Sequence, residues 1–166
     1  MRDDRTTMIM LLLAGFVAGG CAASIGDSCS TNVECSPQGE RICDRAQVEG
    51  YCTIQGCGAN TCPDESVCIR FFPTALLSTP CDPRSEDATN LAVTPTNDCA
   101  SDETCLLSGL CVLRSQEQRF CMFSCEDDSD CRDGYECRRA GTRGAEAVLD
   151  PENLGLEVGG FCAQKG

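Results

Sequence analysis

The chain has 166 residues and a formal net charge of −13, with 17 cysteines and neither histidine nor tryptophan. So acidic a composition excludes nucleic acid as a partner, because phosphate backbones require a basic face. The absence of histidine excludes Ser-His-Asp and Cys-His catalysis, and we expect the protein not to be an enzyme. Cysteine makes up about a tenth of the residues, which is typical of a disulfide scaffold in an oxidising compartment.

The N-terminus carries the features of an export signal. Residues 8–18 read MIMLLLAGFVA, an apolar run shorter than the roughly 20 residues that span a bilayer but as long as a signal-peptide core. The sequence Ala18-Gly19-Gly20-Cys21 ends this segment and resembles the lipobox of bacterial lipoproteins. The resemblance implies a signal peptide over residues 1–20 and a lipidated tether over residues 21–28. A secretory signal cleaved near Ala22 or Ala23 is the alternative.

The lipoprotein resemblance also implies a place in the cell. Acyl chains on Cys21, palmitate among them, would insert into membrane lipid, and several chains together make a firm anchor. An aspartate after the lipidated cysteine retains members of that family in the inner membrane, so Ala22 implies the outer membrane. We therefore expect an exported protein, lipid-anchored to the bacterial outer membrane, on its periplasmic face or at the cell surface.

If Cys21 carries lipid, the other 16 cysteines are an even number and can all pair. They fall into four groups, each with two short gaps followed by a longer one. The groups span residues 29–52, 57–81, 99–121 and 125–162. An aromatic residue precedes the last cysteine in three of them, as Tyr51, Phe120 and Phe161, whereas Pro80 has this place in the second group. The pattern predicts four small disulfide-knotted modules.

Four cysteines permit three pairings, and we expect the interleaved one, first with third and second with fourth. Each such bridge contributes about 3 kcal/mol to the stability of the fold, because it closes a loop of moderate length in the unfolded chain. A first–second bridge closes only a very small loop. The nested pairing, first with fourth and second with third, remains the alternative. The expected bridges are Cys29–Cys43, Cys35–Cys52, Cys57–Cys68, Cys62–Cys81, Cys99–Cys111, Cys105–Cys121, Cys125–Cys137 and Cys131–Cys162.

These modules define the expected fold, a small disulfide-rich protein of tandem knots with short β-hairpins, long loops and little helix outside the signal peptide. Modules 1 and 2 occupy residues 29–81, and modules 3 and 4 occupy residues 99–166. Residues 82–98, rich in Asp, Thr, Asn and Pro, are expected to form the linker. The segment CEDDSDCRDGYEC, residues 125–137, resembles part of EGF-like, WAP-like and Dickkopf-type cysteine-rich modules, a local resemblance that implies no function.

No cofactor is expected, because Cys-x-x-Cys, the spacing of dithiol oxidoreductases and of zinc ribbons, is absent from the sequence. Calcium remains an open alternative for the acidic run Glu126–Glu136, whose carboxylates are hard oxygen ligands. An EF-hand loop beginning at Asp128 fails, because Arg132 and Asp133 occupy its fifth and sixth places. A solvated acidic turn is the simpler interpretation.

The composition and anchor favour a non-catalytic binding or envelope-structural role, with a protein or glycan partner that the sequence does not identify. The alternative is a protease inhibitor that presents the arginine-containing loop Arg138–Gly159. Small disulfide scaffolds can hold such a loop in a protease cleft, provided that the loop is stiff.

Overall fold

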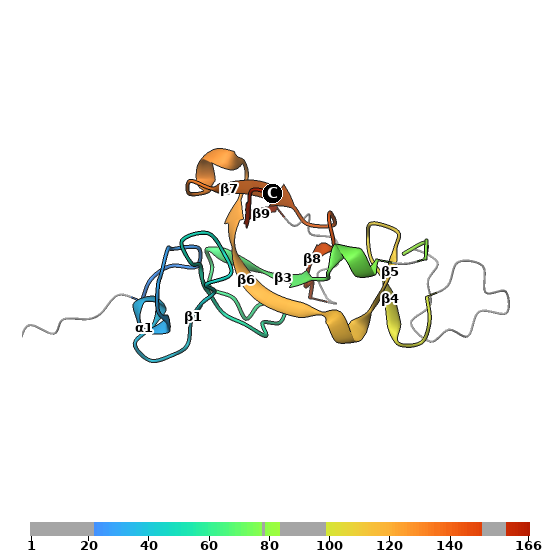
Figure 1. Ribbon diagram of the computed structural model, residues 1–166, viewed down its shortest axis with the longest axis horizontal. Coiled ribbons are helices and arrows are strands. Elements are labelled where there is room, and N and C mark those ends of the chain that lie inside the picture. Colours follow the sequence, from blue (N-terminus) through green and yellow to red (C-terminus); the bar gives the residue numbers. More distant parts are fainter. Residues whose placement is uncertain (1–21, 78, 84–98, 151–158) are drawn as a thin grey trace, which may run out of the picture.

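The computed structural model describes residues 22–77, 79–83, 99–150 and 159–166 (Figure 1). The expected signal peptide, the expected lipid site at Cys21 and most of the expected linker therefore lie outside the described residues. Within the described ranges, no helix combines the length and the apolar character needed to cross a membrane.

The described chain consists of short strands and loops with very little helix, which confirms the expected small disulfide-rich fold. In chain order the elements are α1 (Asn32–Cys35), β1 (Ile42–Cys43), β2 (Cys52–Thr53), β3 (Ser66–Phe71), the 3₁₀ turn η1 (Thr74–Leu76), β4 (Glu103–Cys105), β5 (Cys111–Leu113), η2 (Arg114–Gln116), β6 (Gln118–Cys125), η3 (Asp128–Asp130), β7 (Tyr135–Arg139), β8 (Ala145–Ala147) and β9 (Gly160–Gln164).

An antiparallel five-stranded sheet, in the order β7-β9-β6-β3-β8, is the centre of the fold. Its longest strand, β6, pairs with β3 from Ser66 opposite Phe123 to Phe71 opposite Gln118, and then with the start of β9. Figure 1 shows β6 running from the side of β4 and β5 toward β7 and β9. The pairs β1-β2 and β4-β5 form separate two-stranded sheets. The strand β6 also meets the segment that follows β2, since the N–H of Cys121 donates to the carbonyl oxygen of Ile54 at 3.0 Å and Gln55 forms an isolated bridge with Phe120.

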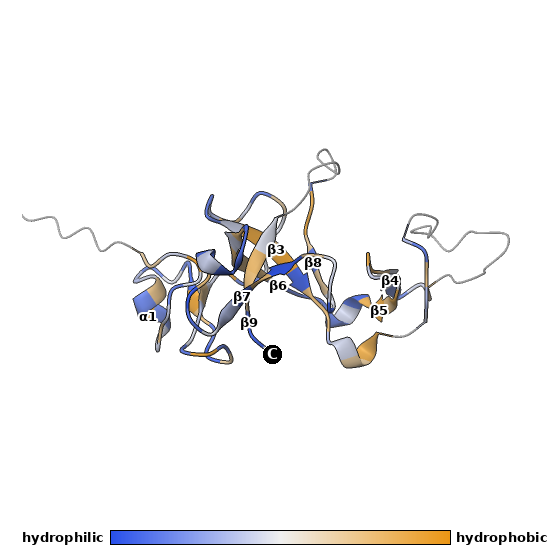
Figure 2. Cartoon of the chain, turned by 90° about the horizontal axis from the view of Figure 1, so that it is seen from above, coloured by the Kyte–Doolittle hydropathy of each residue, from blue (hydrophilic) through white to orange (hydrophobic). Residues whose placement is uncertain are grey.

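Buried side chains gather in three clusters rather than in one large core. The main cluster lies on the five-stranded sheet and includes Tyr51, Ile69, Tyr135 and Phe161, all at most 1% exposed. The second consists of the four cysteines of the first module, and the third of Phe72, Leu106 and Val112. Figure 2 shows hydrophobic segments at β3 and β5 among hydrophilic stretches. Cores this small need covalent bridges for stability.

Eight disulfides link the sixteen cysteines from Cys29 to Cys162, and six of them are the pairs expected from the spacings. Those six are Cys29–Cys43, Cys35–Cys52, Cys57–Cys68, Cys99–Cys111, Cys125–Cys137 and Cys131–Cys162. The other two expectations, Cys62–Cys81 and Cys105–Cys121, are wrong. Cys62 is bonded to Cys121, and Cys81 is bonded to Cys105. So many bridges require an oxidising compartment, as expected.

The interleaved rule holds throughout, but one module is inserted into another. The second quartet is completed by Cys121, and residues 81–111, here called the inserted unit, lie between its third and fourth cysteines. The sheet explains the exchange, because β3–β6 pairing sets Cys68 directly opposite Cys121. Meanwhile the backbone N–H of Cys81 donates to the carbonyl oxygen of Gly109 at 2.9 Å, which aligns Cys81 with the β4–β5 hairpin.

Noncovalent contacts hold the inserted unit against the sheet, since both of its disulfides are internal. Leu106 packs on Phe72, which follows β3. The Glu146 side chain of β8, only 3% exposed, accepts hydrogen bonds from Arg70 Nη2 at 2.5 Å and Nε at 3.2 Å. The same carboxylate accepts a hydrogen bond from the backbone N–H of Leu107. One buried carboxylate therefore ties β3, β8 and the inserted unit together.

Candidate functional site

A groove of about 300 Å³ opens between the first module and the five-stranded sheet. We call it the aromatic groove, and its lining consists of Asp44, Ala46, Gln47, Tyr51, Thr53, Phe71, Gln118, Phe120 and Met122. Three segments that are far apart in the sequence contribute to it. The loop between β1 and β2 is one wall, and β3 and β6 supply the floor.

Strand periodicity explains the floor of the groove. Alternate residues of a strand point to the same face of a sheet, which places Gln118, Phe120 and Met122 together on β6. Phe71 lies opposite Gln118 in the β3–β6 register, and its ring centroid is 6.3 Å from that of Phe120. The Phe71 ring also meets the buried ring of Phe161 edge-on at 5.7 Å. Tilted and edge-on contacts of this kind fix the rings, and Phe71 and Phe120 both remain only half-buried.

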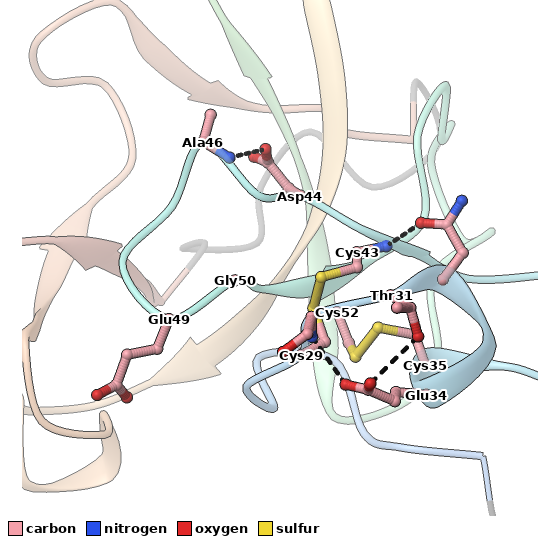
Figure 3. The surroundings of a disulfide bond; sticks show 12 residues. Cys29, Thr31, Glu34, Cys35, Cys43, Asp44, Ala46, Glu49, Gly50 and Cys52 are labelled. Carbon is pink, nitrogen blue, oxygen red and sulfur yellow. Dashed lines mark hydrogen bonds between the residues drawn. A yellow bond between two sulfur atoms is a disulfide. The ribbon is translucent and has the colours of Figure 1, made fainter.

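The wall of the groove is a loop whose shape is determined by its own hydrogen bonds. Asp44 and Tyr51 exchange two backbone hydrogen bonds, at 2.9 and 3.1 Å, and Asp44 Oδ1 accepts one from the N–H of Ala46 at 3.0 Å (Figure 3). Gly50 has φ +68° and lies against the Cys29–Cys43 bridge, where an added Cβ would be 2.0 Å from the carbonyl oxygen of Cys29. Glycine is therefore required at this position.

Arg132, from the fourth module, holds this wall from outside the groove. Its Nη2 donates to the carbonyl oxygen of Val48 at 3.0 Å, to that of Gly50, and to Tyr135 Oη at 2.7 Å. The Tyr135 hydroxyl in turn donates to the Val48 carbonyl at 3.0 Å. Arg132 lies 4.3 Å from the centroid of the Tyr135 ring and 5.7 Å from that of Tyr51, within the range of cation–π attraction.

Both tyrosines of this arrangement are neutral near pH 7. Burial raises the pKa of Tyr51 to about 12, although the hydrogen bond that its hydroxyl accepts from the N–H of Phe123 at 2.9 Å acts in the opposite direction. Burial also raises the pKa of Tyr135. Each phenol keeps its proton, so the Tyr135 hydroxyl remains a donor to the loop and the Tyr51 ring remains an uncharged part of the groove lining.

The groove is apolar at its floor and acidic at its rim. Among the described residues that line it, Asp44 is the one charged side chain, and the amides of Gln47 and Gln118 are the other strongly polar groups. Arginines elsewhere are neutralised by carboxylates, in ion pairs that involve Arg41, Arg70, Arg119, Arg132, Arg138 and Arg143. The net charge of −13 therefore resides on carboxylates that these arginines do not balance.

Three aspartates of the acidic run Glu126–Glu136 accept hydrogen bonds from backbone N–H groups. Asp127 caps η3, where its carboxylate accepts from the hydroxyl of Ser129 at 2.6 Å and from the N–H of Ser129 at 2.8 Å. The hydrogen bond from the hydroxyl, followed by that from the N–H, lowers the pKa of Asp127. Asp128 accepts from the N–H of Cys137 at 2.8 Å, and Asp130 from that of Glu126 at 2.7 Å. These bonds stabilise the turn and satisfy an outward N–H of the edge strand β7. Calcium binding to this run stays an untested alternative.

The arginine segment is not the single surface loop that the sequence suggested. Arg138 and Arg139 belong to β7, and β8 joins the edge of the sheet by pairing with β3. Arg138 is paired with Glu136 at 2.8 Å and donates to the carbonyl oxygen of Gln164 at 3.0 Å. Arg143 is exposed but sits in a left-handed turn, with φ +51°. The structure does not gather these arginines on one projecting loop; residues 151–158 of the segment lie outside the described ranges.

Sequence reasoning did not select the groove residues as a site. Tyr51 and Phe120 were singled out as the residues before a last cysteine, and both now line the groove. No sequence pattern indicated Asp44, Phe71 or Arg132. Only the pairing of β3 with β6 and the packing of the fourth module on the first bring these residues together. Alternation of Gln118, Phe120 and Met122 was the one sequence signal for a floor.

Comparison of the chain with protein-family models, with curated proteins and with solved structures finds no match. The bridges, the groove and the charge distribution are therefore the grounds for a functional proposal.

Proposed function

We propose that the protein is a non-catalytic binding protein of the bacterial envelope, anchored through lipid on Cys21, and that it binds its partner in the aromatic groove. The observation that carries the proposal is the groove itself, an apolar floor with a few polar groups at its rim. Binding sites commonly have this composition. The groove is also held in advance, by disulfides on both sides and by Arg132 behind the wall. Such preorganisation lowers the entropic cost of binding.

The chemistry of the lining supports binding rather than catalysis. The chain has no histidine to serve as a general base. The one hydroxyl-bearing aliphatic side chain of the lining, that of Thr53, donates to the carbonyl oxygen of Cys121 at 2.8 Å. The Asp44 carboxylate is held by the N–H of Ala46 and has no lining hydroxyl assigned to it as a hydrogen-bond partner within the described residues. These groups suit recognition of a partner.

A lipid anchor at Cys21 would keep the folded body close to the bilayer. Ile25 is 1% exposed, and the N–H of Gly26 donates to the carbonyl oxygen of Cys52 at 2.9 Å. The described chain is therefore packed within a few residues of the proposed lipid site. Changing Cys21→Ser should move the protein from the membrane fraction to the soluble fraction. An unchanged distribution would refute the lipid anchor and leave the groove proposal intact.

Binding in the groove can be tested by blocking it from its rim. Ala46 is exposed at the groove edge, so Ala46→Trp should fill the groove without removing a buried contact. Ala100→Trp, at an exposed position outside the lining, is the matched control. The probe is the neutral peptide acetyl-Leu-Gln-Leu-amide, followed by the methyl resonance of Met122. Saturable shifts in the wild type and Ala100→Trp, but not in Ala46→Trp, are expected. Their absence in the wild type would refute the groove as a binding site for apolar peptide.

A further inference from the structure

We infer that the partner bound in the aromatic groove is a protein segment that presents a lysine or arginine next to apolar side chains. This inference rests on the proposed binding function and names the chemistry of the ligand. The apolar side chains would lie on Phe71, Phe120 and Met122, and the cation would reach the carboxylate of Asp44 at the rim.

The floor selects an apolar surface. Phe71 and Phe120 are half-buried, so each ring has one part in the core and another part open to a ligand. Met122, only 4% exposed, lies beneath them on the same face of β6 and adds an adaptable thioether. Aromatic faces also attract ammonium and guanidinium groups, which allows a cationic stem to lie along the floor.

The rim selects a positive charge. The hydrogen bond from Ala46 to Oδ1 orients the Asp44 carboxylate before any ligand arrives. Within the described ranges, no arginine or lysine forms an ion pair with Asp44. Arg45, its neighbour in the chain, lines a different depression together with Glu34 and Glu49. The charge at the groove is therefore negative and is not balanced by an ion pair of this protein.

The charge of the whole molecule also favours a cationic partner. A net charge of −13 raises the local concentration of cationic partners and lowers that of anionic ones. A polypeptide segment is favoured over a small ligand because the groove is open and because Gln47 and Gln118 can accept from and donate to a peptide backbone.

Three peptides that differ at one residue separate the two proposals. Acetyl-Leu-Lys-Leu-amide, acetyl-Leu-Gln-Leu-amide and acetyl-Leu-Glu-Leu-amide are titrated into the full chain, and the Met122 methyl shift gives each dissociation constant. We expect the lysine peptide to bind about fivefold more tightly than the glutamine peptide, and the glutamate peptide to bind most weakly. Raising the salt from about 0.05 to about 0.5 M should remove most of this preference, since the carboxylate is at the rim.

Two variants locate the effect. Asp44→Asn should abolish the lysine preference, whereas Asp64→Asn, at an exposed carboxylate outside the groove, should keep it. If the glutamine peptide binds and the lysine peptide binds no better, the inferred cationic partner is refuted and the binding function stands. A lysine preference that survives in Asp44→Asn also overturns the inference. If no peptide gives saturable shifts, both proposals fail.

Discussion

Replacing Gly50 by alanine tests how the groove wall is held. Gly50 has φ +68°, and an added Cβ would meet the Cys29 carbonyl oxygen at 2.0 Å and its carbon at 2.9 Å. Because these are backbone atoms, no flexible side chain can move aside, and the loop or the adjacent Cys29–Cys43 bridge must shift. Gly39 provides a matched control, since it has φ +81° and nothing lies within 4 Å of its Cβ position.

Both substitutions place alanine in a left-handed backbone conformation, but only Gly50→Ala also creates a steric clash. A left-handed backbone costs an L-residue about 1 kcal/mol relative to glycine, and Gly39→Ala should lower the free energy of unfolding by about that amount. Gly50→Ala adds the cost of overpacking, which is about 1–3 kcal/mol. We therefore expect Gly50→Ala to be the less stable variant by about 2 kcal/mol, with the groove wall displaced.

Unfolding in guanidinium chloride, with the oxidised state verified by mass, measures this difference. Tyrosine fluorescence reports the transition, because the chain has two tyrosines and no tryptophan. The Met122 methyl resonance should also shift in Gly50→Ala and stay in place in Gly39→Ala. Equal losses of stability in the two variants would show that contact with Cys29 does not constrain the loop, and the account of the wall would be wrong.

Three further outcomes are expected. Peptide mapping without reduction should recover Cys62 joined to Cys121, and a different partner for Cys62 would disprove the insertion. Since burial raises the pKa of Tyr51 to about 12 from the ordinary value of about 10, its contribution to stability should be complete below about pH 10 and decline between about pH 10 and 12; a flat profile measured by unfolding in that range would contradict its burial. Glu146→Gln should weaken the attachment of the inserted unit by about 2 kcal/mol, seen as faster exchange of the Leu107 amide hydrogen, and unchanged exchange would exclude Glu146 as the tie.

Cysteine spacing predicted most of the bridges because an interleaved pair depends mainly on short-range geometry. Within the first and fourth modules, the chain between the bonded cysteines folds locally. The number of residues between the cysteines is therefore enough to predict their pairing. The assignment of Cys81 to the second module was wrong because we assumed that each module consists of four consecutive cysteines. The departure of Thr79-Pro80 from the aromatic rule was the signal, since Tyr51, Phe120 and Phe161 each precede the fourth cysteine of a module and Pro80 precedes a first.

The groove could not be predicted in the same way, because it depends on contacts between segments distant in sequence. Phe71 meets Phe120 only through β3–β6 pairing, and Arg132 reaches Val48 only when the fourth module packs on the first. Strand β8 was missed as well, since Ala145–Ala147 is too short for a periodic pattern to reveal and is stabilised by pairing with β3. Patterns within one segment report on that segment, whereas the site is built between segments.

The insertion of one knot into another imposes an order on assembly. Cys62 is synthesised 59 residues ahead of Cys121, whereas the two bridges of the inserted unit can form as soon as Cys111 has followed. During that interval the thiol of Cys62 lacks its native partner, and Cys81, which is synthesised before Cys121, is available as a wrong one. Efficient maturation therefore calls for a catalyst that reshuffles disulfides, and loss of that catalyst should trap the chain with the Cys62–Cys81 bridge.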